Sequence, residues 1–101
     1  MPTMMLQNIQ VTYVSEGEGF PLVLVPEPQG TADLWTPYIP LLEEMCRTIA
    51  YTPALRPEAL RLFLDTLRLE RLYLASPPRS WHTALQFARS APQRLEGLVL
   101  V

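Results

Sequence analysis

The feature that most constrains the fold of this chain is a succession of four short apolar runs, separated by segments with helical spacing. The runs cover residues 22–25, 48–51, 72–75 and 97–101. A continuous apolar run is typical of a strand that is covered on both faces of a sheet, and strands that alternate with helices lie parallel, joined by right-handed crossovers. The sequence therefore predicts a three-layer α/β domain with a mostly parallel sheet.

Three segments between these runs have the spacing of helices that are buried on one side. The first covers residues 34–45 and can be capped by Thr31 or Asp33. The second covers residues 57–67 and begins with a proline, which suits the first position of a helix. The third ends before Pro92. These helices are expected to cover the sheet.

The first residues of the chain predict an antiparallel hairpin. Residues 3–6 and 9–14 have the pattern of two short strands around Gln7 and Asn8. In the second strand, apolar and polar residues alternate, so one face is expected to be buried and the other exposed. The prediction is therefore a parallel sheet with an amino-terminal antiparallel hairpin.

The composition fits one globular domain. Of the 101 residues, 49% are hydrophobic and 18% are charged, which is too apolar for a disordered chain. Ten acidic residues against eight arginines give a net charge of −2 without a basic stripe, so we expect no nucleic-acid partner. The sequence has neither a signal peptide nor an apolar segment long enough to span a bilayer, so we expect no membrane partner and a cytoplasmic location.

Cysteine and histidine each occur once, as Cys46 and His82. A single cysteine cannot form an intramolecular disulfide, and two such residues are too few for a protein metal site. We therefore expect no metal and no cofactor.

Four segments resemble the amino-terminal half of the α/β-hydrolase fold family, and together they cover most of the chain. Residues 13–25 are similar to the family's entry into its first parallel strand, and residues 30–42 to its oxyanion loop and first helix. Residues 47–51 resemble the following strand. Residues 72–101 resemble the nucleophile strand, its elbow, the next helix and the next strand. The resemblance implies a truncated α/β-hydrolase domain over residues 1–101.

The chain departs from the family at the nucleophile elbow, which reads Gly-x-Ser-x-Gly in its members. Matching outward from Ala84 and Leu85, the five places are occupied by Ser76, Pro77, Pro78, Arg79 and Ser80. The nucleophile and both glycines are thus missing. Proline fixes φ near −65° and extends the residue before it, so we expect an ordinary helix start with Pro78 near the first helical position.

Further departures affect the oxyanion loop and the rest of the triad. Pro26, Glu27 and Pro28 stand where the family commonly has His-Gly followed by a residue whose N–H helps to bind the oxyanion, and Pro28 has no N–H. The N–H of Arg79 remains as an anion donor. The family's acidic and histidine partners follow the strand at which this sequence stops.

Several side chains near the elbow have a chemical and a structural interpretation. Ser80 and His82 suggest a nucleophile and base, but residues two apart on a helix point in different directions, so capping by Ser76 or Ser80 is favoured. Arg79 can bind a carboxylate or phosphate at a helix start, or simply be solvated. Trp81, like Trp35, can line a pocket or pack in the core. Arg79, Trp81 and His82 are therefore the candidate ligand-binding residues.

These observations leave three hypotheses for function. The first is a non-catalytic protein of hydrolase fold with a binding role. The alternative is half of a hydrolase or esterase, completed by a second chain or a missing carboxy-terminal part. The third is a regulatory or small-molecule binding domain that uses a pocket above the strand ends.

The last strand predicts an interaction with another polypeptide. It ends in Leu98, Val99, Leu100 and Val101, and it would be an exposed apolar edge unless something pairs with it. We therefore expect a homo-oligomer or a partner chain on this edge.

Overall fold

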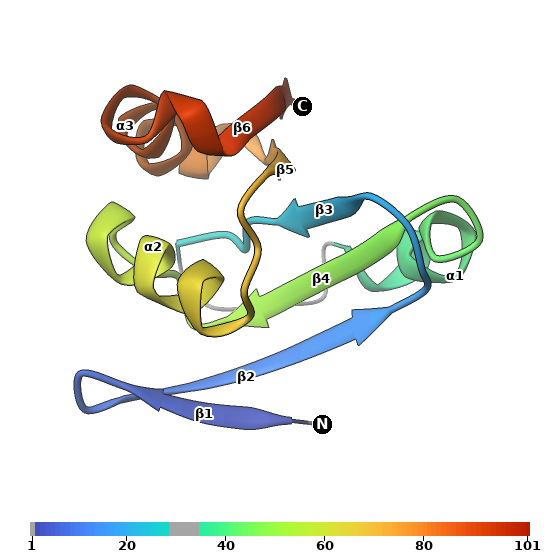
Figure 1. The fold of residues 1–101 in the computed structure, drawn as a ribbon, viewed down its shortest axis with the longest axis horizontal. Coiled ribbons are helices and arrows are strands. Elements are labelled where there is room, and N and C mark those ends of the chain that lie inside the picture. The colour runs from blue at the N-terminus through green and yellow to red at the C-terminus, as the bar shows by residue number, and fades with distance from the viewer. Residues whose placement is uncertain (1, 29–34) are drawn as a thin grey trace.

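The computed structural model describes residues 2–28 and 35–101, which form one six-stranded sheet (Figure 1). The strand order is β1-β2-β4-β3-β5-β6. The strands are β1 (Thr3–Leu6), β2 (Ile9–Glu16), β3 (Pro21–Leu24), β4 (Arg47–Thr52), β5 (Leu72–Ser76) and β6 (Leu95–Leu100).

Strands β4, β3, β5 and β6 are parallel neighbours, and β1 and β2 are antiparallel to the strands beside them. This confirms the predicted α/β sheet with its amino-terminal hairpin. Gln7 and Asn8 form the hairpin turn with φ of 48° and 71°, a conformation that asparagine tolerates better than most residues. β2 is two residues longer than predicted, because Ser15 and Glu16 continue to pair with β4.

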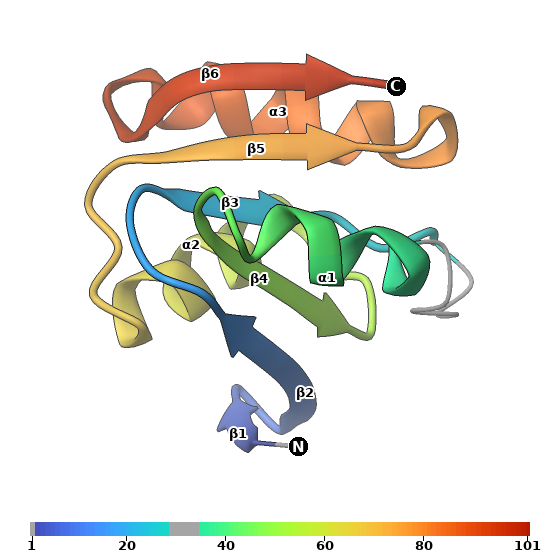
Figure 2. The ribbon, with the colours of Figure 1, turned by 90° about the vertical axis from the view of Figure 1, so that its right-hand side faces the viewer.

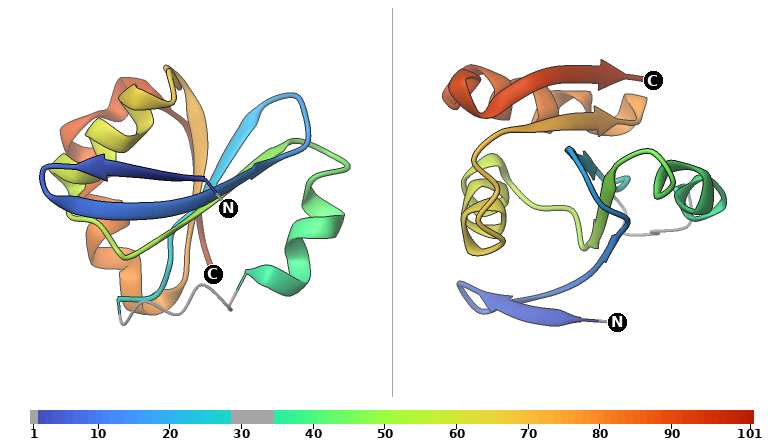
Figure 3. Two further views of the ribbon diagram at one scale, coloured as in Figure 1. Left: turned by 90° about the horizontal axis from the view of Figure 1, so that it is seen from below. Right: turned by 45° about the vertical axis from the view of Figure 1, so that its right-hand side comes forward.

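Helices lie on both faces of the sheet (Figures 1 and 3). α2 (Pro57–Thr66) and α3 (Trp81–Ser90) cover one face, and α1 (Ile39–Leu42) lies on the other. In the described part of the chain, three 3₁₀ turns accompany them: η2 (Thr36–Tyr38), η3 (Pro78–Ser80) and η4 (Pro92–Arg94). The domain therefore has the three layers that the sequence predicted.

The face under α2 and α3 holds the main core. Phe63 of α2 and Phe87 of α3 are fully buried against the sheet, with Leu72 and Leu74 of β5. The ring of Phe63 lies 5.0 Å from the ring of Tyr51. Side chains of this size contribute most to stability when they lose all contact with water.

The face under α1 is covered less completely. Its buried cluster consists of Leu24, Ala50 and Ala75, with Trp35 and Leu42 packed against it. The predicted helix over residues 34–45 is shorter than expected: Pro37 is the second residue of the short η2, and α1 extends only over Ile39–Leu42. A proline lacks the N–H that a helix interior needs, which explains the short elements. The predicted caps Thr31 and Asp33, and the first part of the segment that resembles the oxyanion loop, lie outside the described residues.

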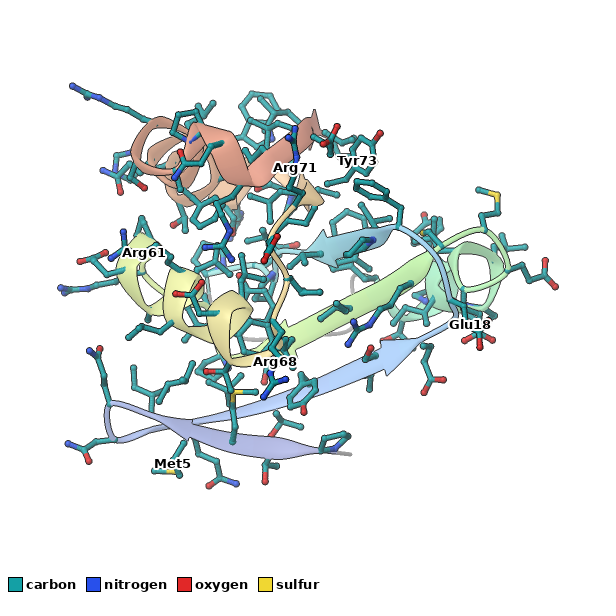
Figure 4. The ribbon with its side chains drawn as sticks, in the orientation of Figure 1. Met5, Glu18, Arg61, Arg68, Arg71 and Tyr73 are labelled. Atoms are coloured by element: carbon teal, nitrogen blue, oxygen red, sulfur yellow. The ribbon has the colours of Figure 1, made fainter. Side chains whose placement is uncertain are left out.

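The same face is open over the last two strands. Figure 2 shows α1 in front of β3 and β4, whereas β5 and β6 have no helix in front of them. Tyr73 of β5 projects on this side (Figure 4), and its ring lies over Gly97 of β6 and 5.0 Å from the ring of Phe20. A Cβ at Gly97 would lie 2.8 Å from the Tyr73 ring, so the glycine makes room for it.

Candidate ligand-binding site

The segment after β5 forms an ordinary helix start. Pro77 is extended, with φ −72° and ψ 163°, and Pro78 is the first residue of η3, which leads into α3 at Trp81. The prediction of an extended Pro77 and a helical Pro78 is confirmed. The strained turn that presents a nucleophile in hydrolases is therefore replaced by backbone geometry that proline prefers.

The two serines of this segment are buried and donate hydrogen bonds to carbonyl oxygens. Ser76 Oγ donates to the Pro77 carbonyl at 3.0 Å, and Ser80 Oγ donates to the Pro26 carbonyl at 2.6 Å. The prediction that one of them caps the helix is wrong, since neither makes a side-chain capping bond. Ser80 instead connects the loop after β3 to the helix start, 54 residues away in sequence.

A cavity of about 420 Å³ lies at the carboxyl ends of the parallel strands. Its lining residues come from the segments after β3, β5 and β6 and from the η2–α1 region. They are Glu27, Trp35, Tyr38, Leu42, Pro77, Pro78 and Val101. We call this the strand-end cavity. Ligands of open α/β sheets bind at this position, beyond the carboxyl ends of the strands.

Trp35 is held in the wall of this cavity. Its indole Nε1–H donates to the Val25 carbonyl at 2.8 Å, and its ring packs against the small cluster on the α1 face. The sequence allowed Trp35 either to line a pocket or to pack in the core. In the structure it lines the cavity and also packs against the small buried cluster. Trp35 therefore forms an aromatic part of the cavity wall that is anchored just after β3 through the Val25 carbonyl.

Arg79, Trp81 and His82, the predicted ligand-binding residues, are exposed and do not line the strand-end cavity. His82 lines a second, more polar cavity beside Arg56 and Glu58 at the start of α2. Ser80 thus contacts the loop after β3, whereas His82 faces the cavity at the start of α2. The binding role of the three residues stays a prediction.

Of the residues at which the sequence departs from the hydrolase motifs, the structure brings Glu27, Pro77 and Pro78 together in the cavity wall. Sequence reasoning missed Tyr38, Leu42 and Val101 as lining residues. The rule that ligands bind beyond strand ends contained a signal for Val101, which directly follows β6. Tyr38 had no such signal, because its place depends on how η2 packs over the sheet.

Within residues 2–28 and 35–101, no helix is both long and apolar enough to cross a membrane. No group of three His, Cys, Asp or Glu side chains that could hold a metal ion occurs in the same residues.

Comparisons with known proteins give a consistent result for the fold. No protein-family model matches the sequence, and neither does any curated protein. The structure is similar to that of an N-acyl homoserine lactone degrading enzyme, with a TM-score of 0.87, 18% identity, and coverage of 99% of this chain and 44% of that one.

Two further solved structures agree. A carboxylesterase from the thaumarchaeon Nitrososphaera matches with a TM-score of 0.87, 19% identity, and coverage of 98% of this chain and 44% of the other. An α/β-hydrolase enzyme from a deep-sea metagenome library matches with a TM-score of 0.87, 14% identity, and coverage of 98% and 43%. The chain spans less than half the length of these proteins. It has a partial α/β-hydrolase fold.

Proposed function

We propose that this chain is a non-catalytic protein of hydrolase fold that binds a small apolar molecule in the strand-end cavity. The observation that carries the proposal is the replacement of the nucleophile turn by Pro77 and Pro78, which now form part of an apolar cavity wall. The cavity volume of about 420 Å³ lies within the range of small-molecule sites, about 300 to 1,000 Å³.

The state of the nearby hydroxyls supports the absence of catalysis. A serine nucleophile needs a base that accepts its proton. Ser80 is 3% exposed, and its hydroxyl donates a hydrogen bond to the Pro26 carbonyl, which cannot act as that base. His82, the single histidine, lines a different cavity. The site can exclude water from a ligand but has no activated nucleophile in the described residues.

Two measurements test this function. Hydrolysis of p-nitrophenyl acetate and butyrate by the purified chain should not exceed the buffer rate, and Ser80→Ala should not change it. The neutral fluorescent probe N-phenyl-1-naphthylamine should bind saturably. Hydrolysis that is abolished by Ser80→Ala would overturn the proposal.

A matched pair of variants locates the probe. Leu42→Phe enlarges a side chain in the cavity wall and should weaken probe binding at least several-fold, because part of the space is filled. Leu41→Phe changes the neighbouring residue of α1, which is 66% exposed and does not line the cavity, and should leave binding unchanged. Equal effects of the two variants would place the probe elsewhere.

A second candidate function is that of one half of a hydrolase completed by another polypeptide. The observation in its favour is that the chain covers only 43% to 44% of the three hydrolases compared above. The free edge of β6, where Val99, Leu100 and Val101 are exposed, offers a place for further strands. Such a partner would have to supply the nucleophile as well as the acid and the base, because proline occupies the nucleophile position.

The sequence encoded beyond codon 101 and a complementation assay test this second candidate. An encoded continuation with further strands, an acidic residue and then a histidine would favour it, provided that the co-expressed polypeptides hydrolyse an ester. Absence of hydrolysis in the assembled complex would leave binding as the function.

A further inference from the structure

The strand-end cavity combines aromatic side chains with one acidic side chain. Trp35 and Tyr38 contribute two rings, and Glu27 contributes the charged group of its lining. Glu27 is half-buried, and neither ion pair of the described residues involves it. A carboxylate without a cationic partner at an apolar cavity attracts positive charge and repels negative charge.

Several backbone and indole hydrogen-bond donors around the cavity are used within the protein, whereas the hydroxyl of Tyr38 makes no hydrogen bond with the described residues. Pro77 and Pro78 have no N–H, and the N–H groups of Tyr38 and Val101 donate to the carbonyls of Trp35 and Ser76. The indole N–H of Trp35 donates to Val25. An anionic ligand needs such donors to replace the water that it loses on binding.

At the start of α3, the backbone N–H of Arg79 has no acceptor among the described residues, but Arg79 does not line the cavity. The N–H groups of Ser80 and Trp81 donate to Pro77 and Pro78 within the 3₁₀ turn, and Trp81 does not line the cavity. Arg79, the nearest basic residue in sequence, is exposed and does not line it either. The described lining therefore offers two aromatic rings, one carboxylate and the Tyr38 hydroxyl, and it contains no basic side chain.

From this chemistry we propose that the strand-end cavity selects apolar molecules that carry an ammonium group over those that carry a carboxylate. The ammonium would be placed between the faces of Trp35 and Tyr38 and the carboxylate of Glu27, and the apolar part against Leu42, Pro77 and Val101. Cations are attracted to aromatic faces, and nearby carboxylates add to that attraction. The inference rests on the proposed binding function and adds the class of ligand.

Three probes with the same tail and different head groups test the selection. Decyltrimethylammonium, decanol and decanoate are titrated at pH 7, below their micellar concentrations, into the Trp81→Phe variant, so that Trp35 is the sole tryptophan that reports binding. The ammonium probe should bind about tenfold more tightly than decanoate, with decanol between them. The difference should shrink at high salt, because part of it is Coulombic.

Glu27→Gln in the same background should reduce the preference to about threefold or less and leave decanol affinity unchanged. Glu44→Gln is the matched control, since Glu44 is exposed and does not line the cavity, and it should keep the full preference. Decanoate binding as tightly as the ammonium probe, or a preference that Glu27→Gln does not reduce, would overturn the inference while decanol binding upholds the proposed function. If none of the three probes binds, both are wrong.

Discussion

The two faces of the sheet differ in how they are covered. Under α2 and α3, Phe63, Phe87 and the inward leucines of β5 are fully buried. Under α1, the buried cluster contains three of the described residues, and Tyr73 and Val99 remain exposed beyond it. The first face carries most of the stability, and the second has free surface and a cavity at its edge. The predictions below test that division.

The largest expected effect is at Phe63. Its ring is fully buried, and it lies 5.6 Å from the ring of Tyr13 and 5.0 Å from that of Tyr51. Phe63→Ala should lower the free energy of unfolding by about 3 to 5 kcal/mol, measured by urea denaturation followed by circular dichroism. Leu42→Ala on the other face should cost about 1 kcal/mol, because Leu42 is only partly buried.

A smaller change, Phe63→Leu, keeps this comparison measurable if the alanine variant does not fold. It should cost about 1 to 2 kcal/mol. If the Phe63 and Leu42 variants lose equal stability, the division between a stabilising face and a binding face is wrong.

The next effect concerns Arg94, which joins three segments at the end of the sheet opposite the cavity. Its guanidinium donates to the Asp65 carboxylate, with Nη1 to Oδ1 at 2.8 Å, to the Glu70 carbonyl at 2.8 Å from Nε, and to the Leu69 carbonyl. The side chain is only 16% exposed. Arg94→Ala should cost about 2 to 3 kcal/mol, because hydrogen bonds from a charged, shielded group are lost.

Arg71→Ala is the control for Arg94. Arg71 pairs with Glu96, but the two side chains are 59% and 32% exposed, so water screens the pair. The expected cost is at most about 1 kcal/mol by urea denaturation. A larger loss for Arg71 than for Arg94 would contradict the importance given to the Arg94 contacts.

The contrast between these arginines also shows what the sequence can and cannot predict. The apolar runs and helical spacing predicted every strand and the helices α2 and α3 closely, because these patterns depend on neighbouring residues. Asp65 is an exposed residue of α2, and its pairing with Arg94, 29 residues away, was not predicted. A contact over that distance depends on how α2 and η4 meet, which no local pattern encodes.

In the candidate site, too, the sequence predicted what depends on local motifs and not what depends on contacts between distant segments. The sequence identified Pro26, Glu27, Pro77 and Pro78 as departures from a hydrolase site, because each occupies a motif position. It did not identify the bond from Ser80 to Pro26, because two distant loops form it. The expected cap at Ser80 was wrong for this reason, because a distant acceptor replaces the local one, whereas Ser76 donates to the carbonyl of the adjacent Pro77.

Tyr51 should produce a smaller change, in the stabilising direction. Its hydroxyl is buried in the main core and has no hydrogen-bond partner among the described residues. Removing an unsatisfied buried polar group is favourable, so Tyr51→Phe should raise the free energy of unfolding by about 1 kcal/mol at pH 7. A decrease of that size in urea denaturation would indicate that the hydroxyl has a partner in solution.

The same residue predicts a pH dependence. Burial raises the pKa of the Tyr51 phenol above its usual value, which is about 10 in unfolded chains. Above pH 10 the unfolded chain therefore loses this proton while the folded chain keeps it, so stability falls as pH rises. The sequence contains no lysine that would titrate in this range. Tyr51→Phe should lose less stability than the wild type between pH 9 and 11.

The smallest effect on stability, and the most informative about partners, is expected at Val99. This residue is 49% exposed on the open part of the α1 face, paired with Ala75 at the edge of the sheet. Val99→Lys should change the free energy of unfolding by no more than about 0.5 kcal/mol. A lysine on an edge strand discourages pairing with another chain, so the variant should associate less than the wild type in sedimentation velocity.

Leu85→Lys serves as the control for association, because Leu85 is 48% exposed on the outer surface of α3 and away from the edge. It should leave the self-association of the wild type unchanged. If the wild type stays monomeric at every concentration, β6 is not a contact between copies of this chain, and its exposed residues then favour a different polypeptide as the partner. If Leu85→Lys reduces association as much as Val99→Lys does, general hydrophobicity rather than the open edge causes it, and the contrast between the two faces does not extend to binding.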